Sequence, residues 1–96
     1  MSLSEQLKTK IDAAIKKFGE YTYRDKGLHE IMDTEEVVTN LFAGVSAKDV
    51  GAAIDQLYQS DANKYGIAVV DLMSELEIRD DYDAIWESCS AIGELF

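Results

Sequence analysis

The residues whose chemistry stands out are carboxylates in the last quarter of the chain. Six of them fall between positions 75 and 87 beside a single base, Arg79: Glu75, Glu77, Asp80, Asp81, Asp83 and Glu87. Carboxylates on successive helical turns approach the charge spacing of nucleic-acid phosphates when a neighbouring helix adds its own. Tyr82 and Trp86 lie among them and are candidate aromatic anchors of an interface, although Trp86 also fits a core position.

The net charge of −10 is concentrated in the second half of the chain. Residues 1–48 hold seven bases and eight acids, whereas residues 49–96 hold two bases and eleven acids. Phosphate contact requires a cationic surface, so the sequence argues against direct binding of nucleic acid. A concentrated negative field instead favours encounter with a basic protein partner.

Residues for nucleophilic or metal chemistry are few. The chain has one thiol, Cys89, in an apolar stripe where a buried, unreactive side chain is expected. It has one imidazole, His29, which with Asp33 four residues on would make at most a two-ligand surface site; a solvated or capping role is expected. Acid–base catalysis by a pair of carboxyl groups requires one of them to be desolvated, so that their pKa values differ, and nothing in the sequence indicates such a pair. We therefore predict no catalytic residue, no cofactor, no metal and no enzymatic activity.

Two partial motifs fail at defining positions. Residues 61–66 resemble the first half of an EF-hand loop, but the fifth and twelfth positions are Tyr65 and Leu72, which supply no calcium ligands. A helix-capping turn at Asp61 is expected there. The Asp-Ser-Leu tripeptide to which acyl carrier proteins attach their prosthetic arm is absent.

The elements that position these residues are expected to be helices, because the chain lacks proline and repeats apolar residues at helical spacing. Ser2 and Glu5 form a capping box for a helix over about 3–18, which Gly19 ends. Residues 20–27 show no helical period, and Tyr21 to Tyr23 favour extended backbone, so we predict an ordered loop.

Further along the chain, a short turn at Leu28 to Met32 precedes a helix capped by Asp33 or Thr34 and ended by Gly44, and Ser46 caps the next. Residues 65–76 include an apolar run that suits a buried strand or a helix; we predict helix, since a single strand would have nothing to pair with. Asp80 or Asp81 is expected to cap a last helix whose apolar side comprises Tyr82, Ile85, Trp86, Cys89, Ile92 and Phe96.

These elements predict an all-α fold, a compact single-domain bundle of about five short helices over residues 1–96. No apolar run is long enough for a membrane span, the N-terminus lacks the pattern of a secretory signal, and a single cysteine suits a reducing compartment. A cytoplasmic location without membrane association is therefore expected.

Two functions remain open at this point. The first is a non-enzymatic acidic protein that inhibits a target by covering its basic, nucleic-acid-binding surface, as in nucleic-acid mimicry or phage and mobile-element counter-defence. Its partner-binding residues would be the six carboxylates of 75–87 together with Tyr82. The alternative is a helical assembly or subunit module that binds through apolar residues, either as a homo-oligomer such as a homodimer or as an immunity-type partner. These residues would be Phe42, Met73, Leu95 and Phe96.

Overall fold

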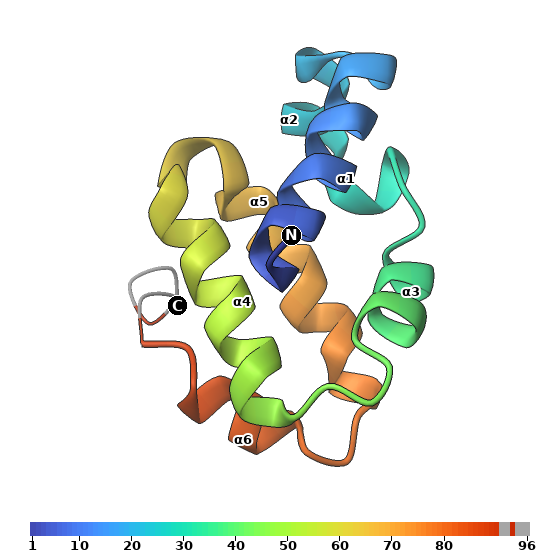
Figure 1. Ribbon diagram of the computed structural model, residues 1–96. Helices are drawn as coiled ribbons and strands as arrows, with labels where there is room; N and C mark the ends of the chain where they lie inside the picture. The colour runs from blue at the N-terminus through green and yellow to red at the C-terminus, as the bar shows by residue number, and fades with distance from the viewer. Residues whose placement is uncertain (91–92, 94–96) are drawn as a thin grey trace.

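Helices account for all regular secondary structure in the part of the chain that the structure describes (Figure 1). The structure is a computed structural model and describes residues 1–90 and 93. Its α-helices are α1 (Leu3–Phe18), α2 (Glu20–Lys26), α3 (Thr34–Glu36), α4 (Ala47–Ser60), α5 (Ala62–Glu75) and α6 (Tyr82–Glu87). Two 3₁₀ turns, η1 (Leu28–Glu30) and η3 (Leu76–Ile78), and a π-helix, η2 (Val37–Leu41), connect them. The predicted all-α bundle is confirmed.

Side-chain caps begin the helices where the sequence places them. The Ser2 hydroxyl accepts from the Glu5 amide at 3.2 Å, and the Ser46 hydroxyl accepts from the Asp49 amide at the same distance. The Asp33 and Asp61 carboxylates accept from amides three residues on, both at 3.0 Å. Each bond satisfies an amide that has no partner inside its own helix, which explains why α1, α3, α4 and α5 begin at these residues.

The predicted loop at 20–27 is wrong, because these residues form α2. Tyr23 decides the conformation: it is 1% exposed, and its hydroxyl donates to the Lys64 carbonyl oxygen. Burial of one large aromatic side chain outweighs the extended preference of the tyrosines. Gly19 and Gly27, with φ of 93° and 86°, bracket α2 by adopting backbone conformations that other residues resist.

Helix α5 supplies much of the core and passes between α4 and α3 (Figure 1). Five of its side chains are buried: Tyr65, Ala68, Val69, Leu72 and Met73. The interpretation of 65–76 as helix rather than strand is confirmed, with η3 taking over at Leu76. The radius of gyration is 12.2 Å, close to the roughly 12.5 Å expected for a compact chain of this length.

Helix α6 packs against α4 at Gly51. A Cβ atom at that position would lie 2.5 Å from Ser88 Cβ and 2.8 Å from the Ile85 carbonyl oxygen, so only glycine permits this approach. The Cys89 thiol, 4% exposed, donates to the Gly51 carbonyl oxygen at 3.3 Å, in agreement with the buried thiol predicted from sequence.

The last helix is shorter than expected. Helix α6 ends at Glu87 and Ser88 is its C-cap, so Cys89, which was predicted to lie within the helix, follows it. The predicted apolar positions Ile92 and Phe96 lie outside the described residues. Asp81, one of the two predicted cap residues, is the N-cap residue of α6, but its carboxylate binds Arg79 and forms no bond to a helix amide. Among the described residues, no helix combines the length and apolar character needed to cross a bilayer.

Candidate acidic interaction site

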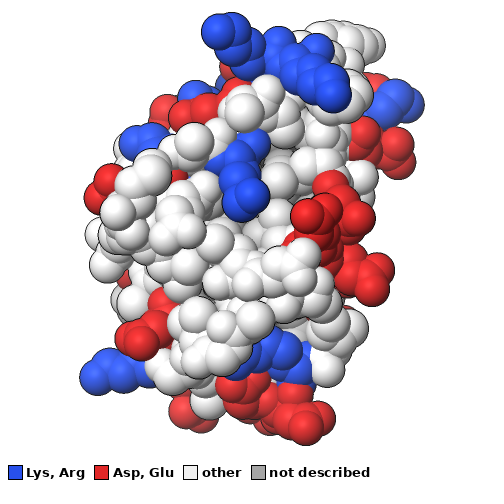
Figure 2. Space-filling model, turned by 45° about the vertical axis from the view of Figure 1, so that its right-hand side comes forward, with Lys and Arg blue, Asp and Glu red and all other residues white. Residues whose placement is uncertain are grey.

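Basic and acidic residues are unevenly distributed over the surface of the bundle. Figure 2 shows most of the Lys and Arg atoms in the upper half of this face, interspersed with Asp and Glu atoms, whereas Asp and Glu atoms predominate at the lower end and along one flank. The lower end is formed by the start of α4, η3, the turn after η3, and α6 (Figure 1). The carboxylates singled out in the sequence belong to this end and to the adjoining end of α5.

Arg79 is the only base between residues 65 and 96, and its side chain turns inward. Its guanidinium donates to the Val45 carbonyl oxygen at 2.9 Å and to the Phe42 carbonyl oxygen at 3.5 Å. It also forms two bonds to the Asp81 carboxylate, at 2.8 and 2.7 Å. Arg79 therefore ties η3 to the segment after η2, and its charge is neutralised internally by one carboxylate.

Four of the six carboxylates are left exposed: Glu77, Asp80, Asp83 and Glu87. None of them forms a side-chain hydrogen bond or ion pair with another described residue. Asp83 and Glu87 lie four residues apart on α6, a spacing that puts both on one face of the helix. We refer to these four side chains as the acidic end.

The other two carboxylates have internal partners. The bonds from Arg79 lower the pKa of the Asp81 carboxyl below its ordinary value and keep it ionised. Glu75 is half-buried and accepts from the Thr34 hydroxyl at 2.9 Å, so it joins α5 to α3. The structure thus divides the sequence-predicted set into a presented group of four and a structural pair.

Aromatic and apolar side chains adjoin the acidic end. Asp83, Trp86 and Glu87 line a shallow hollow of about 390 Å³, and Trp86 also packs against the core. Burial, followed by the charges of Glu77 and Asp83, raises the pKa of the half-buried Tyr82 hydroxyl. Two carboxylates beside an indole can receive a lysine or arginine side chain by ion pairing and cation–π contact.

Sequence reasoning missed Ile78. This side chain is 61% exposed in η3, directly after Glu77. Single exposed apolar side chains are common on protein surfaces, and Ile78 is of interest here because it adjoins the uncompensated carboxylate of Glu77. The available signal was its position: Ile78 falls outside the apolar stripes of both flanking helices.

A second polar cluster joins η1 and α3 to α5. His29 Nδ1 lies 2.6 Å from the Thr34 hydroxyl oxygen, and His29 Nε2 lies 3.8 Å from Asp71 Oδ1. Because Thr34 donates its proton to Glu75, His29 must donate to Thr34. Thr34 is only 3% exposed, so the cluster offers no accessible nucleophile and serves to hold the two segments together. Cys89 contacts α4 instead and is not part of it.

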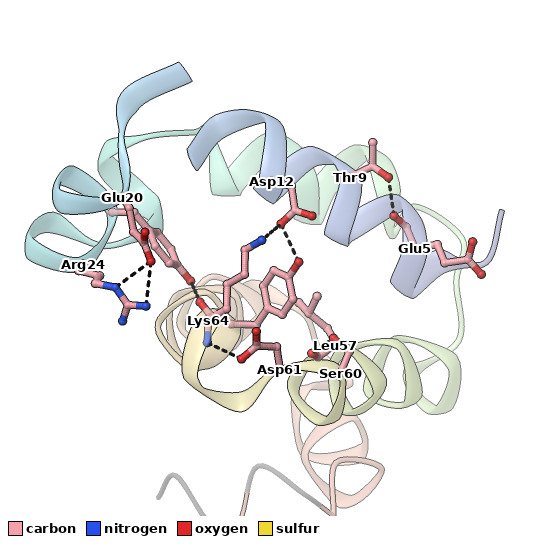
Figure 3. A network of polar contacts seen from close by, with 11 residues as sticks. Glu5, Thr9, Asp12, Glu20, Arg24, Leu57, Ser60, Asp61 and Lys64 are labelled. Atoms are coloured by element: carbon pink, nitrogen blue, oxygen red, sulfur yellow. Dashed lines mark hydrogen bonds and ion pairs between the residues drawn. The ribbon is translucent and has the colours of Figure 1, made fainter. Parts of the chain in front are cut away.

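A third cluster fastens α1 to α5 (Figure 3). The Tyr65 hydroxyl donates to Asp12 Oδ1 at 2.6 Å, and Lys64 Nζ pairs with the same oxygen at 3.0 Å. Burial and the bond to Asp12 raise the pKa of Tyr65 far above its usual range, which makes it unsuitable as an acid or base near neutrality.

Residues 61–66, the partial EF-hand, form the start of α5 with Asp61 as its cap. Within the described residues, no three potential ligands gather into a metal site.

Comparison with known proteins identifies no relative of this chain: no family model, no curated protein and no solved structure matches it.

Proposed function

We propose that this chain is a non-enzymatic binding protein that uses its acidic end to cover a basic, nucleic-acid-binding surface of a target protein. The observation that carries the proposal is the inward position of Arg79, which leaves Glu77, Asp80, Asp83 and Glu87 without a compensating base. Had Arg79 pointed outward, it would have cancelled part of this field at the surface.

Electrostatics and apolar contact have separate roles in this proposal. Uncompensated carboxylates steer a basic partner toward the acidic end and align it, and rim charges of this kind affect association rate and specificity more than final affinity. Affinity comes mainly from buried apolar and aromatic contacts. Ile78 and the indole of Trp86 supply such contacts next to the charges.

Nucleic-acid mimicry is the finer form of the proposal. Asp83 and Glu87 are separated by about 6 Å along α6, whereas phosphates of one DNA strand recur about every 3.4 Å of axis. Helix α6 alone therefore reaches about half the charge density of a strand, and Glu77 and Asp80 of the neighbouring segment raise it. A small acidic protein of this design suits phage or mobile-element counter-defence, where blocking a nucleic-acid site suffices for inhibition.

The alternative assembly module loses two of its predicted contact residues. Phe42 and Met73 are each 1% exposed and belong to the core, so neither is available to a partner. Leu95 and Phe96 lie outside the described residues.

Two variants with matched net charge test the proposal. E77Q/D80N/D83N/E87Q removes the acidic end, and D25N/E30Q/E35Q/D49N removes four exposed carboxylates elsewhere, so both proteins carry the same net charge. Immobilised wild-type and variant proteins are used to capture basic proteins at 50 mM and 500 mM salt, and captured proteins are challenged with duplex DNA.

The proposal expects capture by the wild type and the control set at low salt, loss of capture by the acidic-end set, and release by DNA. Equal capture by both variant sets would show that net charge alone is responsible and would exclude a specific site. Capture that survives high salt unchanged would also contradict the proposal, because screening weakens contacts between exposed charges.

A further inference from the structure

A groove with an apolar floor separates α1 from the segment formed by α3 and η2. Its volume is about 600 Å³, within the roughly 300–1,000 Å³ range of ligand-binding clefts. It is lined by Gln6, Lys10, Ala13, Ala14, Met32, Asp33, Glu36, Val37, Asn40 and Leu41. None of these residues belongs to the acidic end, so the groove is a separate surface.

The groove stays open because short side chains face it from α1. Leu7 and Ile11, in the apolar stripe of α1, are buried in the core, whereas Ala13 and Ala14 line the groove. The methyl side chains of Ala13 and Ala14 are too short to reach the opposite wall, so the space between the walls stays open. Small residues of this kind allow the backbone of another helix to approach closely.

The opposite wall contains the π-helix η2. Val37, Asn40 and Leu41, which all belong to η2, line the groove. The Thr39 hydroxyl donates to the Glu35 carbonyl oxygen at 2.9 Å, a side-chain bond that often bends helices. π-Helical turns are rare in proteins, and those that occur are often at functional sites. Met32 adds a flexible, polarisable side chain of the type used in adaptable binding surfaces.

Charges of opposite sign border the two walls. Lys10 lies on the α1 wall and forms no ion pair with any residue the structure describes. Asp33 and Glu36 lie on the other wall, and both are exposed. An occupant that covers the floor thus meets a cation along one edge and carboxylates along the other.

We propose that this groove binds an amphipathic helix of a partner protein. The α1 wall runs from Gln6 to Ala14, about 12 Å at the rise of an α-helix, so it accommodates about two turns. The bound helix carries an apolar stripe with acidic residues on one side, which pair with Lys10, and basic residues on the other, which pair with Asp33 and Glu36. This is the helix-in-groove mode of recognition.

Three labelled helical peptides with the same apolar stripe test this assignment. One carries Glu along one edge and Lys along the other, one carries Glu along both edges, and one carries Lys along both. Fluorescence anisotropy at 150 mM salt measures binding to the wild type and to K10E. The matched control is K8E, which makes the same charge change at an exposed α1 residue outside the groove lining.

The wild type should bind the mixed peptide about three- to tenfold more tightly than either single-charge peptide, a range set by a few exposed ion pairs. K10E makes both walls acidic, so it should prefer the all-Lys peptide, whereas K8E should keep the wild-type order. A14W, which fills the floor, should abolish binding of the mixed peptide while circular dichroism shows an unchanged helical content.

Other outcomes overturn the proposal. Equal binding of all three peptides, or the same peptide order in K10E and K8E, would mean that the walls do not select charge. Absence of peptide binding together with concentration-dependent dimers that A14W dissociates would assign the groove to a second copy of this chain. These results are independent of the acidic-end variants, which leave the groove unchanged.

Discussion

Replacing Gly51 by alanine should loosen the contact between α4 and α6 that positions the acidic end. The new Cβ would lie 2.5 Å from Ser88 Cβ and 2.8 Å from the Ile85 carbonyl oxygen. Carbon atoms in contact are normally about 3.5–4.0 Å apart, so α6 must move by about 1 Å. Neither neighbouring atom is the end of a flexible side chain, and the movement therefore displaces backbone.

Two opposing terms set the magnitude. Overpacking of a well-packed contact costs about 1–3 kcal/mol, whereas alanine in a helix interior gains about 0.5–1 kcal/mol over glycine. The net expectation is destabilisation by about 0.5–2 kcal/mol. In a domain of this size, each 1 kcal/mol lowers Tm by about 4–8 °C.

Thermal unfolding and thiol labelling together check this expectation. Cys89 donates to Gly51 at the same contact, so displacement of α6 should expose the thiol and speed its reaction with a disulfide reagent under native conditions. The double variant G51A/S88G removes the closer of the two clashes and should recover part of the lost Tm. A higher Tm in G51A with an unchanged labelling rate would show that α4 and α6 are not tightly packed there, and the reasoning would fail.

Three further predictions concern the supports of the bundle. Gly27→Ala should lower stability by about 1–3 kcal/mol in urea unfolding, because φ is 86° and the new Cβ would lie 2.8 Å from Asp71 Oδ2; retention of wild-type stability would refute the assigned backbone strain. Tyr65→Phe should cost about 1 kcal/mol by loss of the hydrogen bond to Asp12, and an unchanged urea midpoint would mean that this bond contributes nothing. Burial raises the pKa of the Cys89 thiol from 9.0 to about 11, so the unfolded chain loses this proton first. The thiol's contribution to stability is complete below pH 9 and should disappear between about pH 9 and 11, on the order of 1–3 kcal/mol; Cys89→Ala should flatten that part of the profile, and identical slopes would contradict it.

Local patterns predicted the helices whose ends and apolar stripes lie within a few residues of one another. Ser2, Ser46 and Asp61 begin helices because capping depends on neighbouring amides, and such bonds are visible in sequence. Helix α2 was missed for the opposite reason. Its Tyr23 is buried by elements distant in sequence and donates to Lys64, a contact across 41 positions that no local pattern records.

The sequence predicted which residues make the candidate site acidic, but not which of them are presented at the surface. Spacing placed Asp83 and Glu87 on one face of a helix, and the structure retains that arrangement. The inward turn of Arg79 depends on the Phe42 and Val45 carbonyl oxygens, more than thirty residues away, so sequence alone could not separate the structural Asp81 from the presented carboxylates. The groove beside α1 was invisible for the same reason, since its two walls meet only through the tertiary fold.

The position of Arg79 also reconciles stability with a concentrated surface charge. On the surface, an arginine among four carboxylates would gain little, because exposed ion pairs contribute about 0–1 kcal/mol, and it would weaken the field that attracts a basic partner. Turned inward, the same guanidinium donates to the carbonyl groups of Val45 and Phe42, which follow η2, and the Phe42 carbonyl also accepts from the Val45 amide. Asp81 completes its coordination from two residues away and holds the turn before α6. One residue therefore fastens the acidic end to the bundle without neutralising the four carboxylates that the end presents.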